Sequence, residues 1–268
     1  MDFTLTEYSR FLKALLKNNA SFETFRGYLE SRNKLKQHES LSSVILRHDV
    51  DRIPQNALKM AQLENSLGIN GTYYFRIVKE SFDKDKIKEV ARLGHEIGYH
   101  YEELDTTSKG TNKSANRDSL IDAAYLSFCS NLNTIREVAE IKTICMHGSP
   151  RSKYDNKDIW KKYDYRKLEI IGEPYFDIDY NEFVYFTDTG RRWNGNRVSV
   201  RDKVKSRYSF DFKNTNDIIK NIEILPSKIC FTIHPERWNN NMLIWGKELV
   251  FQNIKNLIKG WIIVNSKS

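Results

Sequence analysis

Val44-Ile45-Leu46-Arg47-His48-Asp49-Val50-Asp51 decides the fold: an apolar run typical of a buried β-strand ends in two carboxylates with one residue between them. Side chains alternate between the two faces of a strand, so Asp49 and Asp51 point the same way as Arg47, and His48 points the other way. Two acids on one face of a buried strand cost free energy unless a metal ion or a proton separates them. The pair therefore indicates either a functional site or a solvated strand exit, where Asp is a common cap.

Predicted strands and helices alternate along the chain after this stretch. Strands are expected at 71–77, 96–101, 142–147, 183–187, 197–200 and 228–233, and helices at 54–67, 83–93, 115–139, 157–163, 216–225 and 248–258. This alternation is typical of parallel βαβ units. We expect an α/β fold, a distorted (β/α) barrel of about seven parallel strands, in a single domain spanning residues 1–268. Residues 1–40 form a helical extension packed outside, with Ser21 capping its second helix.

Composition places the chain among globular proteins, because 40% of its 268 residues are hydrophobic and 12% are aromatic. The net charge is +8, yet Lys and Arg are interleaved with Asp and Glu along the sequence. This pattern fits a solvated basic surface or an anionic ligand such as a nucleotide-linked or acidic sugar. It does not indicate a nucleic-acid partner.

Three features favour a cytoplasmic protein. The three cysteines form no CxxC pair, which is typical of a reducing compartment. The N-terminus lacks the basic region and apolar core of a secretory signal. No apolar run approaches the ~20 residues that a transmembrane helix needs.

Histidines stand at the ends of three further predicted strands: His100, His147 and His234. In parallel α/β barrels the carboxyl ends of the strands converge on one mouth, where sites are assembled. A lone strand-end histidine is commonly structural, but three of them facing Asp49 and Asp51 predict a functional site. Residue spacing also shows which of the two histidines near the predicted 96–101 strand can face this site.

His95 and His100 are an odd number of residues apart, so they face opposite sides and cannot both be ligands from this strand. Glu102 shares a face with His100, and Gly98 on that face leaves room near the site.

Three motifs then carry a family resemblance: His48-Asp49-Val50-Asp51, Gly94-His95-Glu96-Ile97-Gly98-Tyr99-His100 and Thr232-Ile233-His234. They resemble the first, second and last motifs of the polysaccharide deacetylase family, also called the NodB or carbohydrate esterase 4 family. The stretches 146–150, 187–193 and 234–238 are similar to a divergent branch found among surface-polysaccharide biosynthesis proteins.

The resemblance implies that Asp49 is the general base, that His234 is the general acid, and that Asp51 and His100 bind a divalent metal, expected to be Zn²⁺. The family has a second histidine four residues after the first, where this chain has Leu104. A catalytic zinc ion normally has three protein ligands.

Glu102, Asp105 or His147 must therefore replace the missing imidazole, or the site is weak or lost. Glu102 is the third ligand we expect, because it shares a face with His100. The family's Arg-containing third motif is also absent, so Arg47 or His147 is expected to orient Asp49.

Further residues are expected to contact substrate: His147, Asp188, Arg191, Trp193 and Trp238. For the tryptophans the alternative is core packing, and for Asp188 with Arg191 it is a surface salt-bridge cluster.

The resemblance implies a metal-dependent enzyme that removes an N-acetyl group from an acetamido sugar, nucleotide- or lipid-linked, in O-antigen or capsule biosynthesis. The alternative is a non-catalytic carbohydrate-binding or scaffolding protein on a degenerate barrel, which the loss of the family histidine at Leu104 favours.

Overall fold

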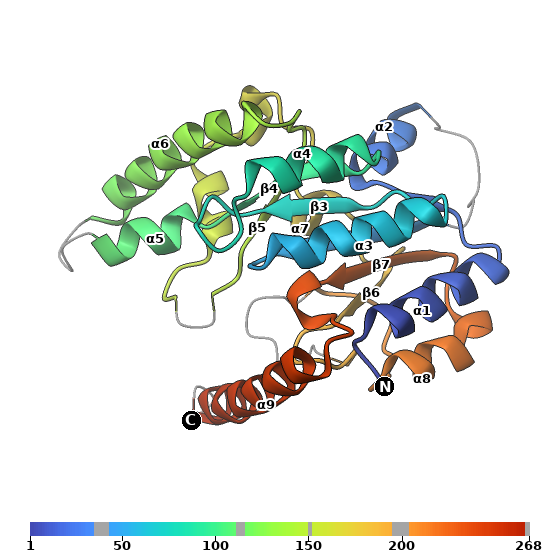
Figure 1. Cartoon of the computed structure of the whole chain (residues 1–268). Helices are drawn as coiled ribbons and strands as arrows, with labels where there is room; N and C mark the ends of the chain where they lie inside the picture. The colour runs from blue at the N-terminus through green and yellow to red at the C-terminus, as the bar shows by residue number, and fades with distance from the viewer. Residues whose placement is uncertain (35–42, 111–115, 150–151, 195–203, 266–268) are drawn as a thin grey trace.

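The computed structural model describes residues 1–34, 43–110, 116–149, 152–194 and 204–265 (Figure 1). Its strands form one seven-stranded sheet in the order β5-β4-β3-β2-β7-β6, with β1 paired to β2 outside this path. Every pairing is parallel. The strands are β1 (Phe22–Glu23), β2 (Ser43–Val50), β3 (Thr72–Phe75), β4 (Glu96–Tyr101), β5 (Ile144–Met146), β6 (Val184–Thr187) and β7 (Lys228–Ile233). The prediction of a distorted parallel (β/α) barrel is confirmed.

Helices surround this curved sheet. Figure 1 shows α3 and α4 side by side over β3, α5 and α6 at the β5 end, and α1 with α8 at the other end. Among the described residues, none of the helices combines the length and apolar character that spanning a membrane requires. The helices are α1 (Leu5–Lys17), α2 (Phe25–Lys34), α3 (Pro54–Ser66), α4 (Lys84–Arg92), α5 (Glu103–Gly110), α6 (Arg117–Arg136), α7 (Pro174–Asp177), α8 (Thr215–Lys220) and α9 (Met242–Asn265).

Strand β2 lies at the centre of the sheet and is buried along its whole length. Its alternating side chains separate as predicted. Arg47 and Asp49 face the concave interior and bind each other. His48 faces the helices, where its ring stacks on Tyr73 at 4.0 Å and its Nε2 lies 2.8 Å from Glu64 of α3. The parity of this strand therefore keeps His48 away from the acidic pair.

Glycine is required at position 98 by a close contact within the sheet. A Cβ atom there would overlap the ring of Tyr74 on β3 and lie 3.1 Å from the Thr143 carbonyl oxygen. The room that Gly98 was expected to leave beside the site is filled by the Tyr74 ring.

Gly98→Ala is expected to lower the free energy of unfolding by about 1–3 kcal/mol, because a buried ring and a strand must move apart. Urea denaturation checks this. Gly110→Ala is the matched control, since nothing lies within 4 Å of its added Cβ. Equal midpoints for the two variants would contradict the contact.

Several boundaries differ from expectation. The short strand β1 and helix α5 are additional, and α9 begins at Met242, six residues before the predicted start. Thr24 caps α2 in place of Ser21, because its Oγ1 accepts the Gly27 N–H at 3.0 Å. The strand predicted at 197–200 lies outside the described residues. The single domain stays a prediction.

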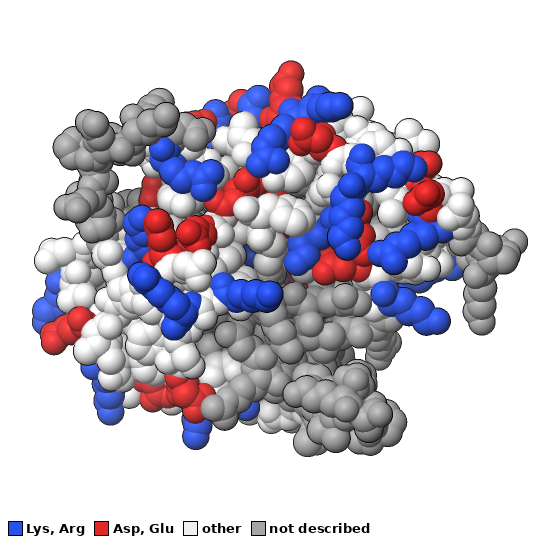
Figure 2. Space-filling view, turned by 180° about the vertical axis from the view of Figure 1, so that it is seen from behind, with Lys and Arg blue, Asp and Glu red and all other residues white. Residues whose placement is uncertain are grey.

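The surface charge follows the sequence pattern. Figure 2 shows Lys and Arg interspersed with Asp and Glu on the face turned away from the viewer of Figure 1. No massed basic tract lies on the described part of that face.

Candidate metal and catalytic site

The carboxyl ends of β2, β4, β5 and β7 bring together the predicted acids and histidines at one edge of the sheet. Asp49 lies on β2 and Asp51 directly follows it, and His100 lies on β4. His147 and His234 directly follow β5 and β7. Ion-pair contacts join Asp51 to both His100 and His147. The convergence expected from parallel βαβ topology thus places these residues close together.

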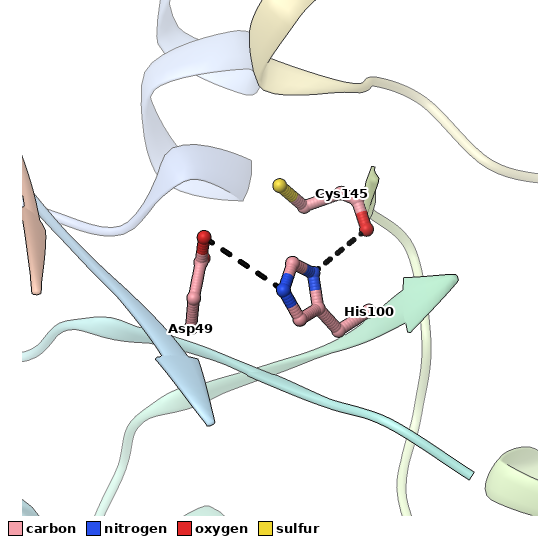
Figure 3. Close-up of side chains that lie close together, drawn as sticks. All are labelled: Asp49, His100 and Cys145. Carbon is pink, nitrogen blue, oxygen red and sulfur yellow. Dashed lines mark hydrogen bonds and ion pairs between the residues drawn. The ribbon is translucent and has the colours of Figure 1, made fainter. Parts of the chain in front are cut away.

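His100 has one ring nitrogen engaged and the other facing the acids. Its Nδ1 lies 3.0 Å from the Cys145 carbonyl oxygen, to which it donates a hydrogen bond. In the neutral ring, Nε2 then carries a lone pair, and it lies 3.4 Å from Asp51 Oδ1 and 3.8 Å from Asp49 Oδ2. Figure 3 shows the ring held between the Asp49 carboxylate and the Cys145 carbonyl.

His147 is oriented in the same way by a carboxylate. Its Nδ1 lies 3.0 Å from Glu102 Oε2, and its Nε2 lies 3.5 Å from Asp51 Oδ1. Glu102 also accepts hydrogen bonds of 2.6–3.0 Å from Arg76. Burial raises the pKa of Glu102, but His147 and Arg76 outweigh it and hold that pKa at about 2. Glu102 is therefore ionised and lies behind His147, which carries the ring nitrogen that faces Asp51.

Leu104 and Asp105, on α5, point elsewhere. Leu104 is buried in a cluster with Leu120, Ile121 and Ala124. One carboxylate oxygen of Asp105 pairs with Lys109 at 2.7 Å. The helix that begins at Glu103 turns position 104 into this cluster, so this position does not face the site.

Asp51 Oδ1 is a buried oxygen for which the described structure provides no hydrogen-bond donor, although it faces two imidazole nitrogens. Burial raises the pKa of Asp51, but His147, His100 and His234 together hold it well below its usual value. Two ligands of one tetrahedral zinc ion lie roughly 3.3 Å apart, given bonds of about 2.0–2.1 Å. The spacings of Asp51 to His100 and to His147 are each near this value. The ligand atoms of all three residues do not lie within 4.8 Å of one another in the described structure, so a metal shared by both imidazoles requires the two rings to move closer together.

A second grouping shares His100. One ligand atom each of Asp49, His100 and Cys145 lie within 4.8 Å of one another (Figure 3). However, both Asp49 oxygens accept hydrogen bonds from Arg47, at 2.8 and 2.6 Å. A cation would have to displace this buried guanidinium or lie beside its charge. Asp51 Oδ1 has no such guanidinium partner, so a cation would meet less competition beside Asp51 than beside Asp49.

Arg47 fixes the orientation of Asp49. The pair is bidentate and almost fully buried, and Arg47 also donates to the Tyr175 hydroxyl at 3.1 Å. A fork of two parallel hydrogen bonds sets the plane of the carboxylate. Of the two residues expected to orient Asp49, the structure brings Arg47 into contact with it.

His234 is held by Asp188, which directly follows β6. Asp188 Oδ1 lies 2.6 Å from His234 Nδ1, and Oδ2 accepts the His234 backbone N–H at 3.0 Å. Arg237 and Trp238 also donate to Asp188, at 2.6 and 2.8 Å. Burial and Arg237 lower the pKa of His234, but Asp188 outweighs them and raises it. His234 therefore keeps its proton to higher pH than an ordinary histidine.

The burial of Asp188 and of both tryptophans does not fit the prediction that they contact substrate. Asp188 and Trp238 are 0% exposed and Trp193 is 2% exposed. Trp238 packs on Phe3 at 4.9 Å, and Trp193 Nε1 donates to Thr215 at 3.0 Å. Asp188 is instead the partner of His234, and the tryptophans belong to the core.

Arg191 is also buried, with its guanidinium 4.7 Å from the Trp245 ring and 5.3 Å from the Phe3 ring. The surface salt bridge with Asp188 is not formed; Arg191 Nη1 donates to the Arg237 carbonyl at 3.4 Å instead. Sequence reasoning missed Arg76, although it directly follows β3 and the strand-end rule would have found it.

Comparison with known proteins gives similarity at the level of structure. The sequence matches no known family profile and no curated protein. A crystal structure of a mutant CE4 family pseudoenzyme is similar with a TM-score of 0.43 and 11% identity, over 83% of this chain and 65% of that one. The wild-type pseudoenzyme from Bacillus anthracis gives 0.42 and 12%, over 83% and 63%.

A family 4 carbohydrate esterase from Bacillus anthracis gives a TM-score of 0.37 and 10% identity, over 80% of this chain and 75% of that one. All three similar structures are of carbohydrate esterase 4 family proteins. This chain spans less than two thirds of the length of the two pseudoenzyme structures. The roles proposed below rest on contacts within this chain.

Proposed function

We propose that this protein is a metal-dependent hydrolase that removes the N-acetyl group from an acetamido sugar. The substrate is a nucleotide- or lipid-linked sugar of O-antigen or capsule assembly, and the reaction takes place in the cytoplasm. The observation that carries the proposal is the buried Asp51 Oδ1, which lies 3.4 and 3.5 Å from Nε2 of His100 and His147. The motif resemblance supports the sugar and the pathway class.

Asp51, His100 and His147 would hold the metal. When bound, a divalent cation such as Zn²⁺ supplies Lewis-acid chemistry, because it lowers the pKa of water and polarises a carbonyl. Glu102 orients His147, and the Cys145 carbonyl orients His100. Such partners of metal-binding imidazoles fix the ring and its tautomer.

Asp49 and His234 divide the proton transfers. Asp49, held by Arg47, accepts a proton as water attacks the acetamide carbonyl and a C–O bond forms. His234, protonated through its pairing with Asp188, gives a proton to the nitrogen as the C–N bond breaks. The products are acetate and a free amino sugar.

Acetate release from a panel of N-acetylated sugars, free, nucleotide-linked and lipid-linked, tests the proposal. Activity should disappear with a chelator and return with Zn²⁺. A metal-loaded protein that binds these sugars without releasing acetate would contradict the proposal and support the non-catalytic alternative.

Asp188→Asn is expected to move the alkaline limb of the pH profile of kcat/KM to lower pH. The reaction needs protonated His234, whose pKa Asp188 raises, and the variant removes that negative charge while Arg237 remains. The pH dependence of acetate release measures this. Asp164→Asn, on the surface, is the control, and an unchanged alkaline limb in Asp188→Asn would refute the role of His234.

A further inference from the structure

Helix α9 turns an apolar face to the solvent. Six apolar side chains of its described residues are between 45% exposed, for Ile244, and 78% exposed, for Leu243. The other four are Met242, Val250, Phe251 and Ile254. At 100° per residue, all of these positions except Met242 fall on one side of the helix. Surface helices ordinarily bury such a face, so an exposed one indicates an interaction site.

The opposite face of α9 attaches the helix to the body of the protein. Trp245 donates from Nε1 to the Asp2 carbonyl at 2.8 Å, and its ring covers Arg191. Gln252, about two turns further on, is buried. The apolar face is therefore not an unpacked core surface, because the helix already buries its other side.

Helix α9 also lies beside the site. Arg52 directly follows Asp51 and donates to both carboxylate oxygens of Glu248 on α9, each at 2.8 Å. The guanidinium of Arg52 also lies 5.9 Å from the Phe251 ring. Figure 1 shows α9 at the edge of the molecule, extending away from the sheet.

The charge of this face decides its partner. Lys247 is exposed within the apolar stripe, and the described residues of the stripe include no acid. The chain as a whole has a net charge of +8. Two copies meeting through this face would bring like charges together, whereas an anionic lipid surface complements them. A helix with one apolar face can lie in the interface plane of a bilayer, and basic residues near the surface attract it to anionic lipid.

We propose that α9 lies in the surface of an anionic membrane through Leu243, Val250, Ile254 and their neighbours. Because Arg52 ties α9 to the residue next to Asp51, this attachment brings the catalytic mouth to the lipid surface. The consequence for substrate rests on the proposed function: the protein would act on an acetamido sugar whose lipid anchor stays in the bilayer.

Vesicle co-sedimentation tests the proposal with the full chain. Wild-type protein should bind vesicles of phosphatidylcholine with phosphatidylglycerol better than vesicles of phosphatidylcholine alone. The triple variant Leu243→Ser, Val250→Ser, Ile254→Ser should bind at least about tenfold more weakly, since three apolar side chains lose their buried contact. Leu126→Ser is the control, because Leu126 is an exposed leucine on α6.

A second variant, Lys247→Glu, leaves the apolar side chains of the face unchanged. It should lose the preference for anionic vesicles. Equal binding by wild type and the triple variant would overturn the proposal. So would absence of vesicle binding together with a dimer, seen by analytical ultracentrifugation, that the triple variant abolishes. Acetate release from a water-soluble acetamido sugar should be unchanged in the triple variant, so failure of the deacetylase proposal is observed separately from failure of membrane binding.

Discussion

Asp49→Asn is expected to lower kcat for acetate release by about 10²- to 10⁴-fold, the usual contribution of a general base. Asparagine keeps an oxygen that accepts a hydrogen bond from Arg47, but its amide cannot take the proton from the attacking water. Metal binding should persist, because Asp51, His100 and His147 are unchanged.

The variant also leaves the buried Arg47 without its counter-charge, which makes a stability control necessary. Thermal unfolding and zinc content should be measured on the same preparation as kcat. Asp122→Asn, at a partly exposed position on α6 where the carboxylate pairs with Lys162, is the matched substitution. A folded, zinc-loaded Asp49→Asn protein with wild-type turnover would remove Asp49 from the mechanism.

His147→Ala is expected to weaken zinc binding by more than about 100-fold. Loss of a residue that only orients a ligand typically costs 10- to 100-fold, so Glu102→Gln should fall within that smaller range. Competition with a chromophoric chelator gives both affinities. The two variants separate a metal ligand from its supporting carboxylate.

Leu104→His is the informative companion to His147→Ala. Because Leu104 packs against Leu120 and Ile121 of α6, an imidazole placed there should not restore zinc binding to His147→Ala. Zinc affinity that survives in His147→Ala but is lost in Glu102→Gln would show that Glu102 is the ligand.

Much of the fold followed from local sequence. The strands at 96–101 and 228–233 have the predicted bounds. Alternation along β2 correctly separated Asp49 from His48. Strand-end positions then brought Asp51, His100 and His147 to one edge, since parallel topology places these ends together.

The rest depended on contacts that no local pattern records. Glu102 follows β4 directly and α5 begins at Glu103, so strand parity no longer governs where the Glu102 carboxylate points. Trp238 is buried against Phe3 and Tyr8, more than two hundred residues earlier in the chain. Asp188 and His234 lie side by side because β6 pairs with β7.

Anomalous diffraction at the zinc absorption edge, from crystals grown with Zn²⁺, tests whether Asp51, His100 and His147 bind one metal ion. We expect one strong peak about 2.0–2.1 Å from Nε2 of His100, Nε2 of His147 and a carboxylate oxygen of Asp51. A peak bound by Asp49 and Cys145, or no peak in this part of the molecule, would contradict this expectation.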